Sequence, residues 1–282
     1  MTLAEIKIET KQLLSKKIDS IELNSLLGML IEEVTGWNRI QQVVEINTPL
    51  TEIQINKFAE YTQALLHDKP IQYILQKAWC MGLEYKVNEH VLIPRPETEE
   101  LIEWVVEYAN IIDKPLQLLD IGTGSGCIAI SLKKALPLCT VTGLDISTEA
   151  LAIAKINATT LHTEVTWIEQ DILGNVQFPH SYDVIVSNPP YIPLREKENM
   201  QEQVKNYEPS IALFVSNEDP LVFYRAIAQL AKTKLAPKGQ LFFEIHYDQG
   251  KAILNLLDEM HFHAEIRRDS FGKNRMIRAS LK

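Results

Sequence analysis

The residues whose types and spacing most clearly suit a chemical role are Asn188-Pro189-Pro190-Tyr191, which follow a short apolar run at 183–186. A proline pair ends a strand because proline has no N–H to donate to the next strand. The chain therefore leaves the sheet at Asn188 and presents an amide oxygen, backbone carbonyls and an aromatic ring together. Such acceptors beside a flat ring suit a substrate with a planar NH2 group. Taken alone, the same residues are also typical of a plain exit from strand to loop.

A glycine-rich turn, Gly122-Thr123-Gly124-Ser125-Gly126, lies upstream between a predicted strand at 116–120 and a predicted helix at 127–135. Such a turn lets the backbone approach a ligand closely at the start of a helix. The glycine spacing differs from the G-x-G-x-x-G of dinucleotide-binding turns. Asp120, at the end of the strand, would repel a pyrophosphate. A cofactor with a cationic amino-acid part and no phosphate fits this turn better.

Two carboxylates follow the next predicted strands. Asp145 ends the strand at 141–145, where an acid accepts hydrogen bonds from ribose hydroxyls, and the upstream glycine-rich turn favours this role. The alternative is that Asp145 begins the following helix with Ser147. Asp171 follows the strand at 165–168 and could accept from an adenine amino group, with Ile172 packed on the ring. A solvated loop carboxylate is the alternative for Asp171.

The order of elements predicts an α/β fold in which a small all-α domain precedes a doubly wound, mostly parallel sheet. Residues 1–75 have helical spacing, and one helix there should be capped by Thr48 or by Thr51 with Gln54. Residues 76–93 read as a β-hairpin linker, and the alternation at Ile71, Tyr73 and Ile74 also suits extended chain. Residues 94–282 should form the sheet domain, with seven strands at 116–120, 141–145, 165–168, 183–186, 240–245, 264–268 and 275–281. A turn is expected at 237–239.

Composition narrows the class of protein. The 282 residues carry 28 basic and 37 acidic side chains, a net charge of −9, which disfavours a surface built to bind many phosphates. Three scattered cysteines indicate a reducing compartment without disulfides. The first residues carry charges where a signal peptide needs an apolar core, and no apolar run approaches the roughly 18 residues of a membrane span. We therefore expect a cytoplasmic protein.

Together, the glycine-rich turn, Asp145 and Asn188-Pro189-Pro190-Tyr191 resemble the class I methyltransferases, which use S-adenosylmethionine and methylate planar nitrogens. Within that class, the string Ile93-Pro94-Arg95-Pro96-Glu97-Thr98-Glu99 resembles the signature of the HemK/PrmC group, the glutamine N5-methyltransferases of peptide chain release factors. The resemblance covers nearly the whole chain. Departures from it are Gln76, where a glycine is expected, and the loop at 214–217, which lacks the usual glycines.

The resemblance implies a Rossmann-like methyltransferase domain, S-adenosylmethionine as cofactor, S-adenosylhomocysteine as product, and no metal. The substrate would be the glutamine of the Gly-Gly-Gln motif in class I peptide chain release factors, held by the helical domain, with no membrane or direct nucleic-acid contact. Substrate-binding residues would be Asn188, Pro189, Pro190 and Tyr191, with Asn188, Pro189 and Tyr191 catalytic. Cofactor-binding residues would be Asp120, Gly122, Thr123, Gly124, Ser125, Gly126, Asp145, Asp171, Ile172 and Asn188.

Three other functions share parts of this pattern. A glutamine methyltransferase of a ribosomal protein would use the same Asn-Pro-Pro-Tyr string. An amino methyltransferase of DNA or RNA would need a basic groove and a pocket for an extruded base, which the acidic balance disfavours. A nicotinamide-dependent dehydrogenase or a binding module would leave the acceptors after Asn188 without a purpose.

Overall fold

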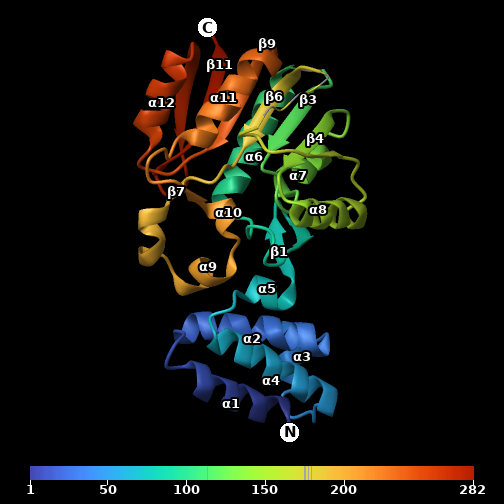
Figure 1. Ribbon diagram of the computed structural model, residues 1–282. Coiled ribbons are helices and arrows are strands. Elements are labelled where there is room, and N and C mark those ends of the chain that lie inside the picture. Colours follow the sequence, from blue (N-terminus) through green and yellow to red (C-terminus); the bar gives the residue numbers. More distant parts are fainter. Residues whose placement is uncertain (113, 175, 177, 179) are drawn as a thin grey trace. The chain divides into compact units, whose positions relative to one another are not determined.

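The computed structural model describes residues 1–112, 114–174, 176, 178 and 180–282, and its chain divides into two units (Figure 1). The first unit comprises residues 1–76 and 201–207, and the second comprises residues 77–200 and 208–282. The division therefore places residues 77–93, expected as a linker, with the sheet unit. The helices of the first unit are α1 (Leu3–Leu14), α2 (Ser20–Thr35), α3 (Arg39–Val44), α4 (Glu52–Leu66), α5 (Ile71–Leu75) and α9 (Glu202–Tyr207).

The helical unit closes around the apolar stripe of α2. Leu23, Leu27 and Leu30 are buried against side chains of α1 and α4, as their spacing predicts. Thr51 caps α4 and forms a capping box with Gln54, so of the two predicted caps the structure has this one. The unit is thus held by the packing of amphipathic helices.

The prediction of extended chain at Ile71, Tyr73 and Ile74 is wrong, because these residues form helix α5. Pro70 precedes the helix, where its missing N–H removes no helical hydrogen bond. Burial of Tyr73 and Ile74 stabilises the helical turn. The helix ends at Gln76 in the left-handed conformation, with φ 55°. This conformation favours glycine, the residue that the resemblance led us to expect there.

A seven-stranded sheet forms the centre of the second unit, in the order β10-β11-β9-β6-β3-β4-β5. Strands β9, β6, β3, β4 and β5 run parallel, whereas β11 is antiparallel to both β9 and β10. Its strands are β3 (Gln117–Ile121), β4 (Thr140–Asp145), β5 (Thr166–Glu169), β6 (Tyr182–Ser187), β9 (Leu235–Glu244), β10 (Phe262–Arg268) and β11 (Asn274–Leu281). The predicted mostly parallel, doubly wound fold is confirmed. The strand order reverses beside β3, where such sheets bind ligands.

Helices cover both faces of the sheet (Figure 1). On β6, Val184 and Val186 pack into the apolar core that contains α6 and α7, whereas Ile185 packs into the core with α11 and α12. This alternation buries both faces, which explains the continuous apolar run of the strand. The helices are α6 (Pro96–Ile112), α7 (Cys127–Ala135), α8 (Thr148–Thr160), α10 (Ser210–Leu213), α11 (Val222–Lys234) and α12 (Gly250–Glu259), with the short 3-10 helix η1 (Leu194–Asn199).

Two smaller pairings complete the unit. Strands β1 (Lys77–Cys80) and β2 (Leu83–Lys86) form the predicted hairpin, with Met81 and Gly82 both at positive φ in its two-residue turn. Strands β7 (Ile192–Pro193) and β8 (Phe214–Val215) pair in parallel after the Asn-Pro-Pro-Tyr string.

The expected turn at 237–239 lies inside β9 rather than before it. The pairing of β6 with β9 jumps from Tyr182 opposite Leu235 to Val184 opposite Gln240. Lys238 takes a positive φ of 66° within this irregularity. The strand therefore absorbs the extra residues as a bulge, which is how sheets tolerate proline and glycine.

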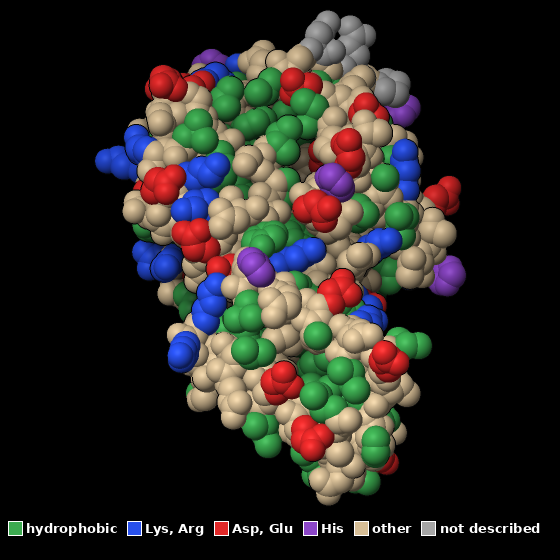
Figure 2. Space-filling model, turned by 60° about the horizontal axis from the view of Figure 1, so that its bottom comes forward, with side chains coloured by type: hydrophobic (Ala, Val, Ile, Leu, Met, Phe, Trp, Pro, Cys, Tyr) green, Lys and Arg blue, Asp and Glu red, His purple; other side chains and the backbone are tan. Residues whose placement is uncertain are grey.

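The surface carries both signs of charge. Figure 2 shows Lys and Arg side chains interspersed with Asp and Glu over the face drawn. Within the residues that the structure describes, no helix is both long enough and apolar enough to cross a membrane.

Candidate active site

The glycine-rich turn joins β3 to α7 through three residues in the left-handed region. Gly122, Gly124 and Gly126 have φ values of 74°, 55° and 82°, which residues with a side chain rarely adopt. The amides of Gly122 and Thr123 both donate to the carbonyl oxygen of Leu144 on β4, at 2.8 and 2.9 Å. The turn is therefore tied across to the neighbouring strand, and its backbone forms one wall of a cavity.

Asp120 anchors this turn from inside the protein. It is 1% exposed, and its Oδ2 accepts hydrogen bonds from the Thr123 hydroxyl at 2.5 Å and from the Ala129 amide at 3.2 Å. Burial raises the pKa of the Asp120 carboxyl to about 7. The described residues that line the cavity do not include Asp120. Its Oδ1 is buried and has no hydrogen-bond partner among the described residues, and the expectation that this carboxylate meets a cationic part of the cofactor stays a prediction.

Asp145 lies at the carboxyl end of β4 and lines the cavity. Its Oδ2 accepts from the Gly124 amide at 2.8 Å and its Oδ1 from the Ser147 amide at 2.9 Å. Burial raises the pKa of this carboxyl, while these amides act in the opposite direction. Ser147, not Asp145, caps α8. Each Asp145 oxygen has a further lone pair with which to accept a hydroxyl hydrogen.

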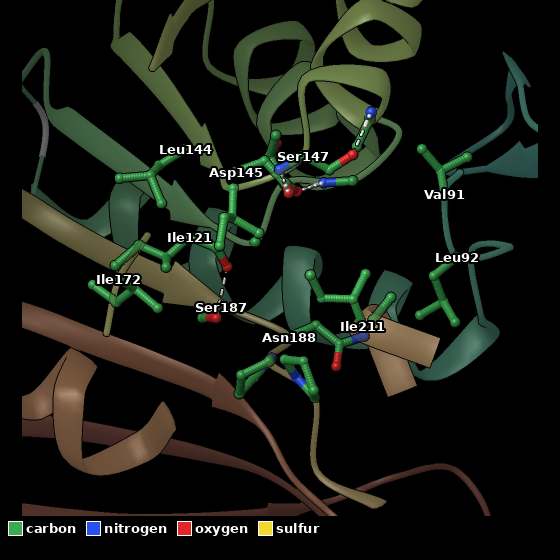
Figure 3. A pocket seen from close by; sticks show the side chains of 18 of the residues that line it. Val91, Leu92, Ile121, Leu144, Asp145, Ser147, Ile172, Ser187, Asn188 and Ile211 are labelled. Atoms are coloured by element: carbon green, nitrogen blue, oxygen red, sulfur yellow. Dashed lines mark hydrogen bonds between the residues drawn. The ribbon is translucent and has the colours of Figure 1, made fainter. Parts of the chain in front are cut away.

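The cavity has a volume of about 300 Å³ and opens where β3, β4 and β6 end. In Figure 3, Asp145 and Asn188 lie on opposite sides of the open space. Its walls also include Asp171 and Ile172, where Asp171 accepts from the Leu173 amide at 2.9 Å. A mostly apolar cavity of this size with a few polar groups is typical of a small-molecule site.

Asn188, Pro189 and Pro190 line the same cavity. The Asn188 Nδ2 donates to the Thr98 hydroxyl at 3.3 Å, and the Thr98 hydroxyl donates to Glu244 Oε2 at 2.7 Å. Thr98 lies in the first turn of α6 and Glu244 at the end of β9. One hydrogen of the Asn188 NH2 is engaged by Thr98, and no hydrogen bond among the described residues uses Oδ1, so this oxygen can accept from a ligand.

Tyr191 lies outside the described lining of the cavity. Its hydroxyl donates to Glu244 Oε1 at 3.3 Å, and its ring contacts that of His246 with centroids 5.8 Å apart. Burial raises the pKa of the Tyr191 hydroxyl well above its ordinary value. The expectation that Tyr191 packs on a substrate amide stays a prediction. Gly126, also expected at the cofactor, lies outside the lining as well and begins α7.

The string at 93–99 turns out to hold several segments together. Arg95 forms an ion pair with the buried Glu208, which also accepts from the Ile93 amide at 3.3 Å. Glu97 lies 3.9 Å from Arg275 of β11. Thr98 and Glu244 were not predicted as site residues. The Glu244 position carried a signal, because it places an acid inside the apolar strand predicted at 240–245, and a carboxylate in a buried strand needs partners.

Comparison with known proteins gives matches over most of the chain. Residues 108–206 match the model of the "Methyltransferase small domain", and residues 6–75 match the "PrmC N-terminal domain". A Flavobacterium psychrophilum protein named release factor glutamine methyltransferase is 40% identical over 285 residues, with all of both chains covered. A Bacteroides thetaiotaomicron protein of the same name is 46% identical over 77% of each chain.

The fold has a counterpart among solved structures. A methyltransferase from Pyrococcus furiosus superposes with a TM-score of 0.53 at 17% identity, covering 79% of this chain and 100% of the other. At that identity the likeness concerns the fold alone.

Within the described residues, no cluster of three or more His, Cys, Asp or Glu side chains could hold a metal ion.

Proposed function

The chain belongs to the family of release factor glutamine methyltransferases, and from that premise we propose its reaction and the residues that perform it. It transfers a methyl group from S-adenosylmethionine to the side-chain N5 of the glutamine in the Gly-Gly-Gln motif of class I peptide chain release factors. The observation that carries this assignment is the Asn188 amide, which lines the cavity with its NH2 engaged by Thr98. An oxygen acceptor held in this way matches the N–H groups of a carboxamide substrate.

The volume of the cavity and the residues that line it support S-adenosylmethionine as its ligand. Asp145 has free lone pairs beside the glycine-rich turn for ribose hydroxyls, and Ile172 and Leu173 provide an apolar wall for a base. We assign Gly122, Thr123, Gly124 and Ser125 of the turn, together with Asp145, Asp171, Ile172 and Asn188, to cofactor binding. We also assign Asp120 to the cationic part of the cofactor, since its buried Oδ1 has no partner among the described residues, whereas Gly126 begins α7 and shapes the turn. When bound, the cofactor supplies an activated methyl group on a sulfonium.

The chain's own contribution to the reaction is alignment. An amide nitrogen is a weak nucleophile because its lone pair is delocalised into the carbonyl. If Asn188 Oδ1 and the Pro189 carbonyl accept its two N–H groups, they fix the nitrogen and favour its pyramidal form. Positioning of this kind can contribute roughly 7–11 kcal/mol. Tyr191 would pack against the amide plane. The proton that nitrogen loses can pass to solvent, so no dedicated base is assigned.

We assign the helical unit to holding the release factor. Its helix α3 exposes Ile40, Val43 and Val44, which are 76%, 73% and 72% exposed. Neighbouring apolar side chains that stay in solvent are typical of surfaces that contact another protein. If this assignment holds, Val43→Asp should raise the KM for an intact release factor and leave the kcat unchanged.

The test of the function is methyl transfer from labelled S-adenosylmethionine to separate purified substrates. We expect label on a class I release factor and none on a variant whose motif glutamine is replaced by alanine. Mass spectrometry of the digested product should place the methyl group on that glutamine. Transfer to a ribosomal protein or to DNA, with none to the release factor, would refute the proposal.

A further inference from the structure

One buried carboxylate holds both polar side chains of the Asn-Pro-Pro-Tyr string. Glu244 Oε2 accepts from Thr98, which accepts from Asn188, and Glu244 Oε1 accepts from the Tyr191 hydroxyl at 3.3 Å. Glu244 and Thr98 are 1% and 2% exposed. The chain of hydrogen bonds joins the start of α6, the end of β9 and the loop after β6. These groups are therefore fixed by the tertiary structure around them.

The direction of these hydrogen bonds follows from the carboxylate. An ionised carboxylate can only accept, so the Thr98 hydroxyl must give its single hydrogen to Glu244. The Thr98 oxygen then has only lone pairs for Asn188, which must turn its NH2 toward it. The two ends of an asparagine amide have almost the same shape, so packing alone would leave this choice open. The negative charge of Glu244, at the far end of the hydrogen-bond chain, decides which end of the Asn188 amide faces Thr98.

We propose that Glu244 and Thr98 are positioning residues that set the orientation of the Asn188 amide, so that its oxygen rather than its NH2 meets the substrate nitrogen. The inference rests on the proposed function, since it concerns the glutamine-binding end of the same site. A reversed Asn188 amide would present donors to the substrate NH2 and leave both groups unpaired, which is costly in a closed site. Through Tyr191, the same carboxylate also holds the second polar side chain of the string.

The orientation of the Asn188 amide should depend on pH, because Glu244 can be protonated. Burial raises the pKa of the Glu244 carboxyl to about 7, Arg275 of β11 lowers it, and Glu97 of α6 raises it. Thr98 and Tyr191 donate to the carboxylate, and Tyr224 of α11 donates to the backbone oxygen of Glu244 at 3.1 Å. Protonated Glu244 can donate a hydrogen bond to Thr98, so the hydrogen bonds from Asn188 through Thr98 to Glu244 no longer have a fixed direction. Methyl transfer should therefore fall as the pH drops through this pKa.

Four variants test the inference in a release factor methylation assay at saturating cofactor. Thr98→Val keeps the shape but removes the hydroxyl, and we expect kcat to fall about tenfold, the worth of roughly one net hydrogen bond. Thr98→Ser should restore kcat to near the wild-type value. Glu244→Gln should abolish the acid limb of the pH profile, because glutamine does not titrate. Tyr224→Phe removes a buried hydroxyl that donates to the Glu244 backbone oxygen and contacts neither Thr98 nor the Glu244 carboxylate by a described hydrogen bond. It is the matched control and should retain both kcat and the acid limb.

Calorimetric titration with S-adenosylmethionine shows whether each variant is folded, since none of the substituted side chains is assigned to the cofactor. The pKa of Asp120 is also raised, so the acid limb is assigned by comparing wild type with Glu244→Gln rather than from wild type alone. An unchanged acid limb in Glu244→Gln, or equal losses in Thr98→Val and Thr98→Ser, would overturn the inference while the proposed function stands. A wild-type protein inactive on the release factor would overturn both.

Discussion

Replacement of Asn188 by alanine tests the acceptor role of its amide most directly. Asn188 lines the cavity, and its Nδ2 is engaged by Thr98 at 3.3 Å, so Oδ1 is the atom offered to the substrate. Alanine removes this oxygen and keeps the backbone that leads into the two prolines. Loss of one preorganised polar group in an active site lowers kcat by about 10²–10³-fold. We expect a fall of that size in methyl transfer to the release factor.

The affinity for S-adenosylmethionine should change much less in Asn188→Ala. At most one neutral hydrogen bond to the cofactor is lost, worth ~0.5–1.5 kcal/mol, so the Kd should rise no more than about tenfold. Calorimetry gives the Kd, and mass spectrometry of the release factor at saturating cofactor gives kcat. Asn255→Ala, an exposed position on α12, serves as the control for a lost asparagine. Near-normal turnover by Asn188→Ala would refute the reasoning.

Three further predictions concern the cofactor and stability. Asp145→Ala should weaken cofactor binding about 10–100-fold, the worth of one or two hydrogen bonds to a charged group; unchanged affinity by calorimetry would reject the ribose assignment. Gln76→Gly should raise the free energy of unfolding by about 1 kcal/mol in urea, because Gln76 is exposed at φ 55°, whereas Gln76→Ala should not. The folded-state pKa values of Asp120 and Glu244 are each raised to about 7, so the native state binds protons more tightly than the unfolded chain. Their contribution to stability should be present below about pH 4 and lost as the pH rises through 7; urea unfolding that shows no such fall, or an equal fall in Glu244→Gln, would contradict this sign for Glu244.

Much of the fold could be read from local pattern. The apolar run at 183–186 and the glycine-rich turn after Asp120 predict a strand that ends at a proline pair and a strand–turn–helix unit, and the structure has both. Where the local pattern was ambiguous, the reading failed. Ile71–Leu75 alternates like a strand but forms a helix because Tyr73 and Ile74 both become buried, and the residues 237–239 form a bulge because β6 continues to pair beyond them.

For the site, too, some features could be predicted from the sequence and others only from the structure. The sequence by itself determined that Asp145 and Asn188 each stand where a buried strand ends, because an apolar run and a proline pair are local properties. In the sheet, β3 lies between the two strands that carry them. Only the tertiary structure decided that Asn188 is joined to Glu244 through Thr98, which is 90 residues away from Asn188 and 146 from Glu244. The partner of a buried polar group depends on which distant segment packs against it, and no spacing along the chain encodes that choice.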